Sequence, residues 1–72
     1  MVRTMIEINQ LKHTDVGRWV TYSRDFGEPE NGKLKSWNHK YIFVVFHCAG
    51  DWDNFMDYTG ASVDPEYLTF DG

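Results

Sequence analysis

Cysteine and long apolar runs, which would identify a secreted or membrane-bound protein, are scarce in this sequence. The 72 residues include one cysteine, Cys48, so no disulfide can form within the chain and no zinc site with several cysteine ligands can be built. The longest apolar run, residues 41–46, is far shorter than the roughly 20 residues needed to cross a bilayer. Residues 1–12 lack the pattern of a signal peptide. We therefore expect a cytoplasmic protein without a membrane segment.

Basic residues are absent from the C-terminal part of the chain. Residues 1–47 hold all seven basic and five acidic residues, a net charge of +2, whereas residues 48–72 hold six acidic residues and no basic one, a net charge of −6. Such a segment repels phosphate, which makes DNA or RNA an unfavoured ligand. The acids are either a solvated surface that keeps the protein soluble or an acidic face for a basic partner.

The chain is too short for two hydrophobic cores, since a domain usually contains about 100 to 200 residues. Apolar residues make up 42% of the sequence and aromatic residues 17%, well above the proportions found in disordered chains. We predict a single folded domain over residues 1–72.

Alternating and β-branched residues predict a mainly β fold. The predicted strands are 18–22, 33–37, 41–48, 59–63 and 69–70. The second and third should form a hairpin, and the third, apolar on both faces, should be central. Residues 23–32 read as a long contact loop that ends in an Asn-Gly tight turn. Residues 1–12 fit either a short helix or a turn.

The alternation within these strands predicts which side chains face the interior. The predicted interior residues are Val20, Leu34, Phe43, Val45 and Leu68.

Two short helices are predicted between the later strands. Asp51 can cap a helix over residues 51–58, with Trp52, Phe55 and Met56 on one face, packed inward over strand 41–48. The residues expected to point outward from this helix are Asp53, Asp57 and Tyr58. Asp64 followed by Pro65 is typical of a helix start, with room for about one turn.

In the order of its elements the chain resembles the SH3-like small barrel. The stretches that carry the likeness are residues 17–22, 30–37 and 64–70. The resemblance implies a five-stranded SH3-like barrel with a one-turn 3-10 helix before the last strand. Residues 51–58 depart from the ordinary barrel as a short inserted helix. A fold shared by many functions implies little chemistry.

The stretch Trp-Asp-x-Phe-x-x-Tyr-Thr-Gly-Ala, residues 52–61, resembles short proteins of unassigned role encoded by bacteriophages and prophages. This likeness implies an accessory protein that acts in the cytoplasm of a host cell.

Motifs for catalysis or metal binding are missing. His47 and Cys48 are adjacent on a predicted strand, so their side chains point to opposite faces and cannot both reach one ion or form a nucleophilic pair. No phosphate-binding glycine loop, serine elbow or HExxH sequence occurs. We expect no enzyme activity, no metal and no cofactor.

Aromatic residues exceed what so small a core can enclose, so some should form a binding surface. Our leading hypothesis is a noncatalytic protein-binding module, which as a phage protein would inhibit a host defence protein by covering its basic surface. Its predicted contact residues are Asp51, Trp52, Asp53, Asp57, Tyr58 and Trp37. A second copy of the chain is another candidate partner.

Two other functions remain open from the sequence. One is a barrel that binds or sequesters a small molecule or nucleotide, with the ligand stacked on a tryptophan. Its candidate residues are Arg18, Arg24, Lys35, Trp37 and Trp52. The other is a nucleic-acid-binding barrel that uses Arg18, Lys33, Lys35 and Lys40.

Overall fold

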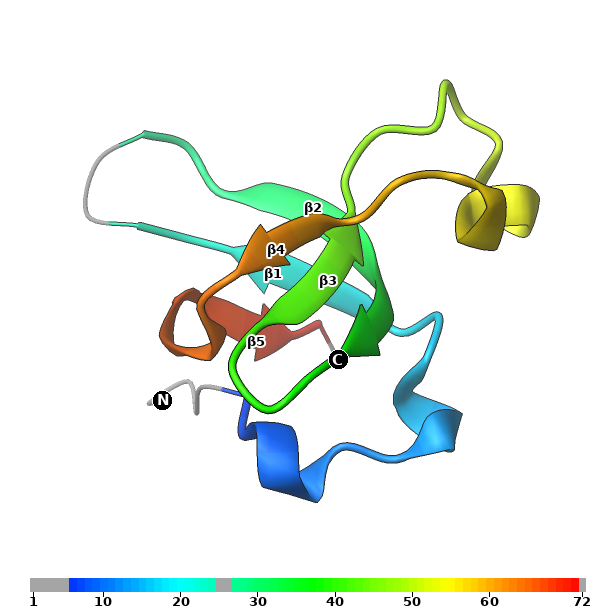
Figure 1. Ribbon diagram of the computed structural model, residues 1–72. Coiled ribbons are helices and arrows are strands. Elements are labelled where there is room, and N and C mark those ends of the chain that lie inside the picture. Colours follow the sequence, from blue (N-terminus) through cyan, green and yellow to red (C-terminus); the bar gives the residue numbers. More distant parts are fainter. Residues whose placement is uncertain (1–5, 25–26, 72) are drawn as a thin grey trace.

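A computed structural model describes residues 6–24 and 27–71 and contains one five-stranded antiparallel sheet (Figure 1). The strands are β1 (Trp19–Tyr22), β2 (Glu30–Trp37), β3 (Ile42–Val45), β4 (Ala61–Val63) and β5 (Leu68–Phe70). Their order across the sheet is β4-β3-β2-β1-β5. The predicted mainly β class, the hairpin of β2 with β3 and the inner position of β3, between β2 and β4, are confirmed.

The sheet is open, so the expectation of a closed five-stranded barrel is not met. β4 and β5 form its two edges. Each edge strand has only three residues, and a single 3-10 turn, η4 (Pro65–Tyr67), joins the two. The predicted helical turn after Asp64 is confirmed at this place.

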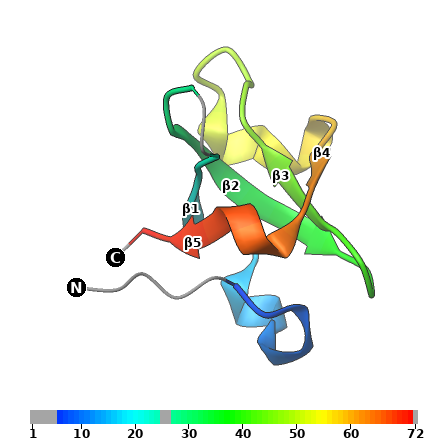
Figure 2. The same ribbon diagram turned by 90° about the vertical axis from the view of Figure 1, so that its left-hand side faces the viewer.

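Three further 3-10 helices lie outside the sheet: η1 (Ile8–Gln10), η2 (His13–Asp15) and η3 (Trp52–Asp57). η3 lies at the opposite end of the molecule from η1 and η2 (Figures 1 and 2). Residues 1–12 were expected to form a short helix or a turn. From Ile6 onward this segment contains one 3-10 turn, η1, and residues 1–5 lie outside the described residues. None of the helices in the described part of the chain is long and apolar enough to cross a membrane.

The main core lies on one face of the sheet. Its buried members are Ile6, Val20, Leu34, Ile42, Val44, Val63 and Leu68. The predicted interior positions of Val20, Leu34 and Leu68 are confirmed.

The face of β3 that joins this core is not the predicted one. The core contains Ile42 and Val44, whereas Phe43 is half-buried and Val45, although fully buried, lies outside the main cluster. Successive strand residues point to opposite faces. Because both faces of this strand are apolar, alternation alone could not select the face that points to the core.

The Asn-Gly pair was expected to form a tight turn. In the structure it is part of β2. Gly32 is buried and pairs with Val20 of β1. A Cβ atom at Gly32 would lie 2.7 Å from Val44 Cγ1 and 2.7 Å from the Val45 carbonyl oxygen. Glycine is therefore needed here because β2 and β3 approach too closely for any side chain. The loop between β1 and β2 is correspondingly shorter than residues 23–32 and ends before Glu30.

Candidate protein-binding surface

Helix η3 is a 3-10 helix, interrupted at Asn54, whose backbone is not helical. The predicted capping by Asp51 is wrong, since its side chain accepts no hydrogen bond from the backbone of the helix. The Asp51 carboxylate instead accepts hydrogen bonds from Asn54 Nδ2 at 2.9 Å and from the Tyr58 hydroxyl at 3.2 Å. Partial desolvation and then the Asp51 charge raise the pKa of Tyr58, so the phenol stays protonated and able to donate.

An aromatic cluster joins η3 to the sheet. The rings of Trp52 and Trp19 are 4.7 Å apart at 60°. Between the sheet and the helix lies Lys33 of β2, whose Nζ is 5.2 Å from the centre of the Trp19 ring and 5.3 Å from that of Phe55. Lys35 Nζ donates a hydrogen bond to the carbonyl oxygen of Tyr58 and so fixes the far end of η3. These contacts hold the helix on β1 and β2 without a buried residue of its own.

Large apolar groups in this region remain exposed. Trp19 is 41% exposed and Met56 is 50% exposed, the two large hydrophobic residues most open to solvent in the described chain. The prediction that Met56 packs inward is therefore wrong, because a six-residue 3-10 helix with a break cannot keep the i, i+3, i+4 face of an α-helix together. Trp52 and Phe55 do turn toward the sheet and are half-buried.

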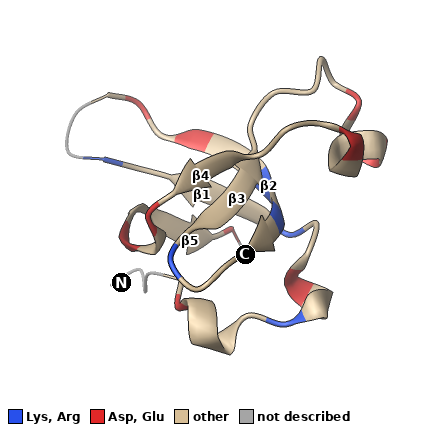
Figure 3. Cartoon of the chain, in the orientation of Figure 1, with Lys and Arg blue, Asp and Glu red and all other residues tan. Residues whose placement is uncertain are grey.

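Acidic side chains lie on or next to η3, the helix whose Trp52 packs on the exposed Trp19. Asp51, Asp53 and Asp57 are all exposed and lie on or next to η3 (Figure 3). We call the surface formed by these groups the tryptophan face; its residues are Trp19, Trp52, Phe55, Met56, Asp53 and Asp57. Trp19 was not predicted as a contact residue, because the sequence pattern indicates only that it belongs to a strand. Its pairing with Lys33 across β1 and β2 cannot be recognised before the register is known.

Trp37, the sixth predicted contact residue, is not part of the tryptophan face. It packs at the margin of the main core, with its ring 6.5 Å from that of His13. The structure thus brings five of the predicted contact residues together at η3 and places the sixth elsewhere.

The predicted ligand-binding cations are not gathered around a tryptophan. Arg18 forms an ion pair with Asp15 at 3.0 Å, and its guanidinium lies 3.8 Å from the centre of the Phe70 ring. Arg24 lies 5.1 Å from the centre of the Tyr67 ring, and Lys35 is bonded to η3. The backbone N–H of Lys12, and then Arg18, lower the pKa of Asp15, which keeps this carboxylate ionised.

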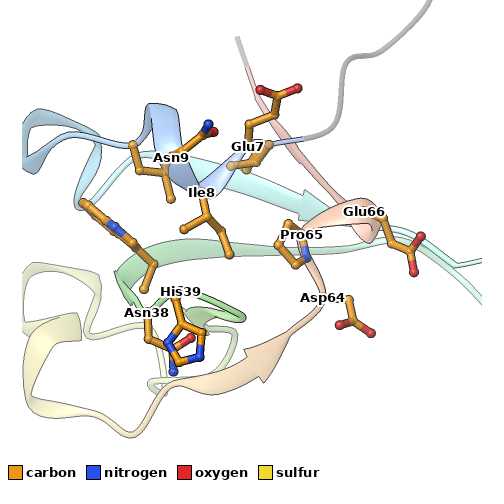
Figure 4. Close-up of a pocket in the computed structure, with 11 residues that line it drawn as sticks. Glu7, Ile8, Asn9, Asn38, His39, Asp64, Pro65 and Glu66 are labelled. Atoms are coloured by element: carbon orange, nitrogen blue, oxygen red, sulfur yellow. The ribbon is translucent and has the colours of Figure 1, made fainter.

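A second surface feature, which sequence reasoning missed, is an open groove of about 1040 Å³ next to Trp37. It runs between η1, the β2–β3 turn and η4, and Ile8 and Pro65 lie on either side of it (Figure 4). Its lining residues are Ile6, Glu7, Ile8, Asn9, Leu11, Trp37, Asn38, His39, Asp64, Pro65 and Glu66. Because these residues come from three segments distant in sequence, no local motif could predict the groove.

The described residues contain neither a cluster of metal-ligating side chains nor an exposed cysteine thiol. No group of three or more His, Cys, Asp or Glu side chains there could hold a metal ion. His47 is exposed, whereas Cys48 is a buried free thiol. The two residues follow the end of β3 at Val45, so the predicted strand 41–48 is too long at both ends.

Trp52→Ala is expected to lower the free energy of unfolding by about 1 to 2 kcal/mol, since an aromatic pair contributes about 0.5 to 1.5 kcal/mol beyond its buried area. The partner ring Trp19 should then become more exposed and its fluorescence emission should shift to longer wavelength. Urea denaturation followed by fluorescence measures both. Trp52→Phe is the control and should retain most of the stability; a Trp52→Ala protein as stable as wild type would show that the ring contact stabilises nothing.

Comparison with known proteins gives no match: no family model, no curated protein and no solved structure matches the chain.

Proposed function

We propose that the protein is a noncatalytic binding module whose tryptophan face contacts a basic surface of another protein. The observation that carries the proposal is the position of Trp19, which is 41% exposed although its ring packs on that of Trp52 and lies 5.2 Å from the Lys33 ammonium. Tryptophan residues that are held rigidly and yet exposed are frequent among the residues that dominate interface energies.

The charges around this face favour a partner of opposite sign. Asp53 and Asp57 are exposed beside Met56, and no basic residue follows Lys40 in the sequence. The nearest cations, Lys33 and Lys35, lie beneath the helix and are engaged with Phe55 and with the Tyr58 carbonyl. A basic protein surface would meet an apolar centre and an acidic rim, the arrangement common to protein interfaces.

A finer proposal follows from the resemblances in the sequence. The strand order and the 3-10 turn between β4 and β5 support membership of the SH3-like small barrels, with η3 as an insertion. The likeness of residues 52–61 to phage and prophage proteins supports an accessory protein that covers the nucleic-acid-binding surface of a host defence protein.

The charge reversal Asp53→Lys with Asp57→Lys is expected to weaken partner binding at least tenfold while leaving the melting temperature nearly unchanged. Both carboxylates are exposed and form no ion pair in the described residues, so they contribute little to stability. The immobilised protein would capture partners from a bacterial lysate, and quantitative mass spectrometry would compare the variants.

The matched control carries the same change of charge elsewhere, Asp64→Lys just before η4 together with Glu66→Lys on it. A partner of the tryptophan face is retained by wild type and by this control but lost by the η3 variant and by Trp19→Ala. Its binding should also weaken between 0.1 M and 1 M salt, as the Debye length falls from about 10 Å to about 3 Å. A partner that both charge variants lose equally would contradict the proposal, because only net charge would then matter.

A further inference from the structure

We infer that the groove beside Trp37 is a second binding site, independent of the proposed function, and that it takes an extended peptide segment in which apolar residues alternate with lysine or arginine. The groove and the tryptophan face lie in different parts of the molecule, since η1 and η3 are at opposite ends (Figures 1 and 2).

The floor of the groove is apolar. Ile6 is buried, while Ile8, Leu11, Trp37 and Pro65 are half-buried and line the space. These residues come from the N-terminal segment, the end of β2 and the start of η4. The hydrogen bond from the Ile6 backbone N–H to the Leu68 carbonyl oxygen, 3.1 Å long, holds the N-terminal segment against β5 and so fixes one wall of the groove.

The rim of the groove is acidic. Glu7 stands on one side and Asp64 and Glu66 on the other, all exposed, with their carboxylates directed outward (Figure 4). No lysine or arginine lines the groove. The one basic ring in the lining is that of His39, and the ammonium of the adjacent Lys40 lies 5.3 Å from the centre of the Tyr41 ring. The rim therefore favours cationic groups and disfavours phosphates.

An extended peptide suits this combination of an apolar floor and a charged rim. Successive side chains of an extended chain point to opposite sides, so apolar residues can enter the groove while the residues between them reach the carboxylates. A small molecule would be poorly enclosed, because the groove is open and as large as the widest small-molecule pockets, which reach about 1000 Å³. A two-fold dimer through this groove would place the same acidic rims against each other.

The test uses a fluorescein-labelled heptapeptide that alternates leucine and arginine, with fluorescence anisotropy as the readout. We expect saturable binding to the full chain, and at least a tenfold loss of affinity in the triple variant Glu7→Gln, Asp64→Asn, Glu66→Gln. A matched triple variant that removes three exposed carboxylates outside both the groove and the tryptophan face, Glu28→Gln, Glu30→Gln, Asp71→Asn, should lose less than threefold. Peptides with alanine in place of leucine, or with glutamate in place of arginine, should bind at least tenfold more weakly.

Amide chemical shifts locate the peptide. Changes concentrated at residues 6–11, 37–39 and 64–66 would support the inference, whereas changes at residues 51–58 would overturn it. Equal weakening by the two triple variants would also overturn it, because attraction to the net negative charge would then explain the binding. If a peptide without basic residues bound equally well, the groove would be a hydrophobic surface only, and the proposed preference for lysine or arginine would be wrong.

Discussion

Val45→Asp is expected to prevent the chain from folding. Val45 has no exposed surface, and it lies on the opposite face of β3 from Ile42 and Val44, which belong to the main core. An aspartate there would have to be ionised without a partner or stay protonated, and either choice costs several kcal/mol. The whole free energy of unfolding of a small domain is about 5 to 15 kcal/mol, so the native state would lose most of its population.

Circular dichroism and a thermal melt measure this effect, with Ser62→Asp as the control. Ser62 is exposed on β4 and pairs with Phe43 across the same part of the sheet. This variant adds the same charge at the surface and should melt cooperatively within a few degrees of wild type. If Val45→Asp also melted cooperatively near the wild-type temperature, the second face of β3 would have to be open to solvent.

The β class and most of the core could be predicted from the sequence because they depend on local pattern. Leu34 lies between two lysines, and Val20 and Leu68 each precede a threonine, so the alternation predicts their burial. β3 could not be oriented in the same way, since residues 41–46 are apolar throughout. The register shift between Leu34 and Ser36 further changes which residues of β2 and β3 are neighbours, and no local signal marks it.

The candidate binding surfaces depend even more on tertiary structure. The sequence correctly drew attention to residues 51–58, because acids and aromatic residues are concentrated there. It could not show that Trp19 packs on Trp52 or that Lys33 lies near both Trp19 and Phe55, since these contacts join residues at least 14 positions apart in the sequence. The groove beside Trp37 was missed for the same reason, as Glu7 and Glu66 come to line one groove only when the chain has folded.

Gly32→Ala is expected to lower the free energy of unfolding by about 3 kcal/mol, near the upper end of the usual cost of overpacking. The added methyl group would lie 2.7 Å from both Val44 Cγ1 and the Val45 carbonyl oxygen, and 3.0 Å from Phe46 Cδ1. A side chain can rotate away from a clash, but the Val45 carbonyl belongs to the backbone of β3. The methyl group must therefore push β2 away from β3.

Denaturant titration of Gly32→Ala and of Ser36→Ala, an exposed position of the same strand, separates this clash from a general effect of alanine on β2. At roughly 4 to 8 °C for each kcal/mol in a domain of this size, the Gly32 variant should melt more than 10 °C below wild type, and the Ser36 variant close to it. Because β2 lies at the centre of the sheet, between β1 and β3, its displacement also disturbs Trp19 and Lys33, which pair across β1 and β2. The Gly32 variant should therefore lose the tryptophan face together with its stability. A Gly32→Ala protein as stable as wild type would mean that β2 and β3 are farther apart than their contact at Gly32 implies.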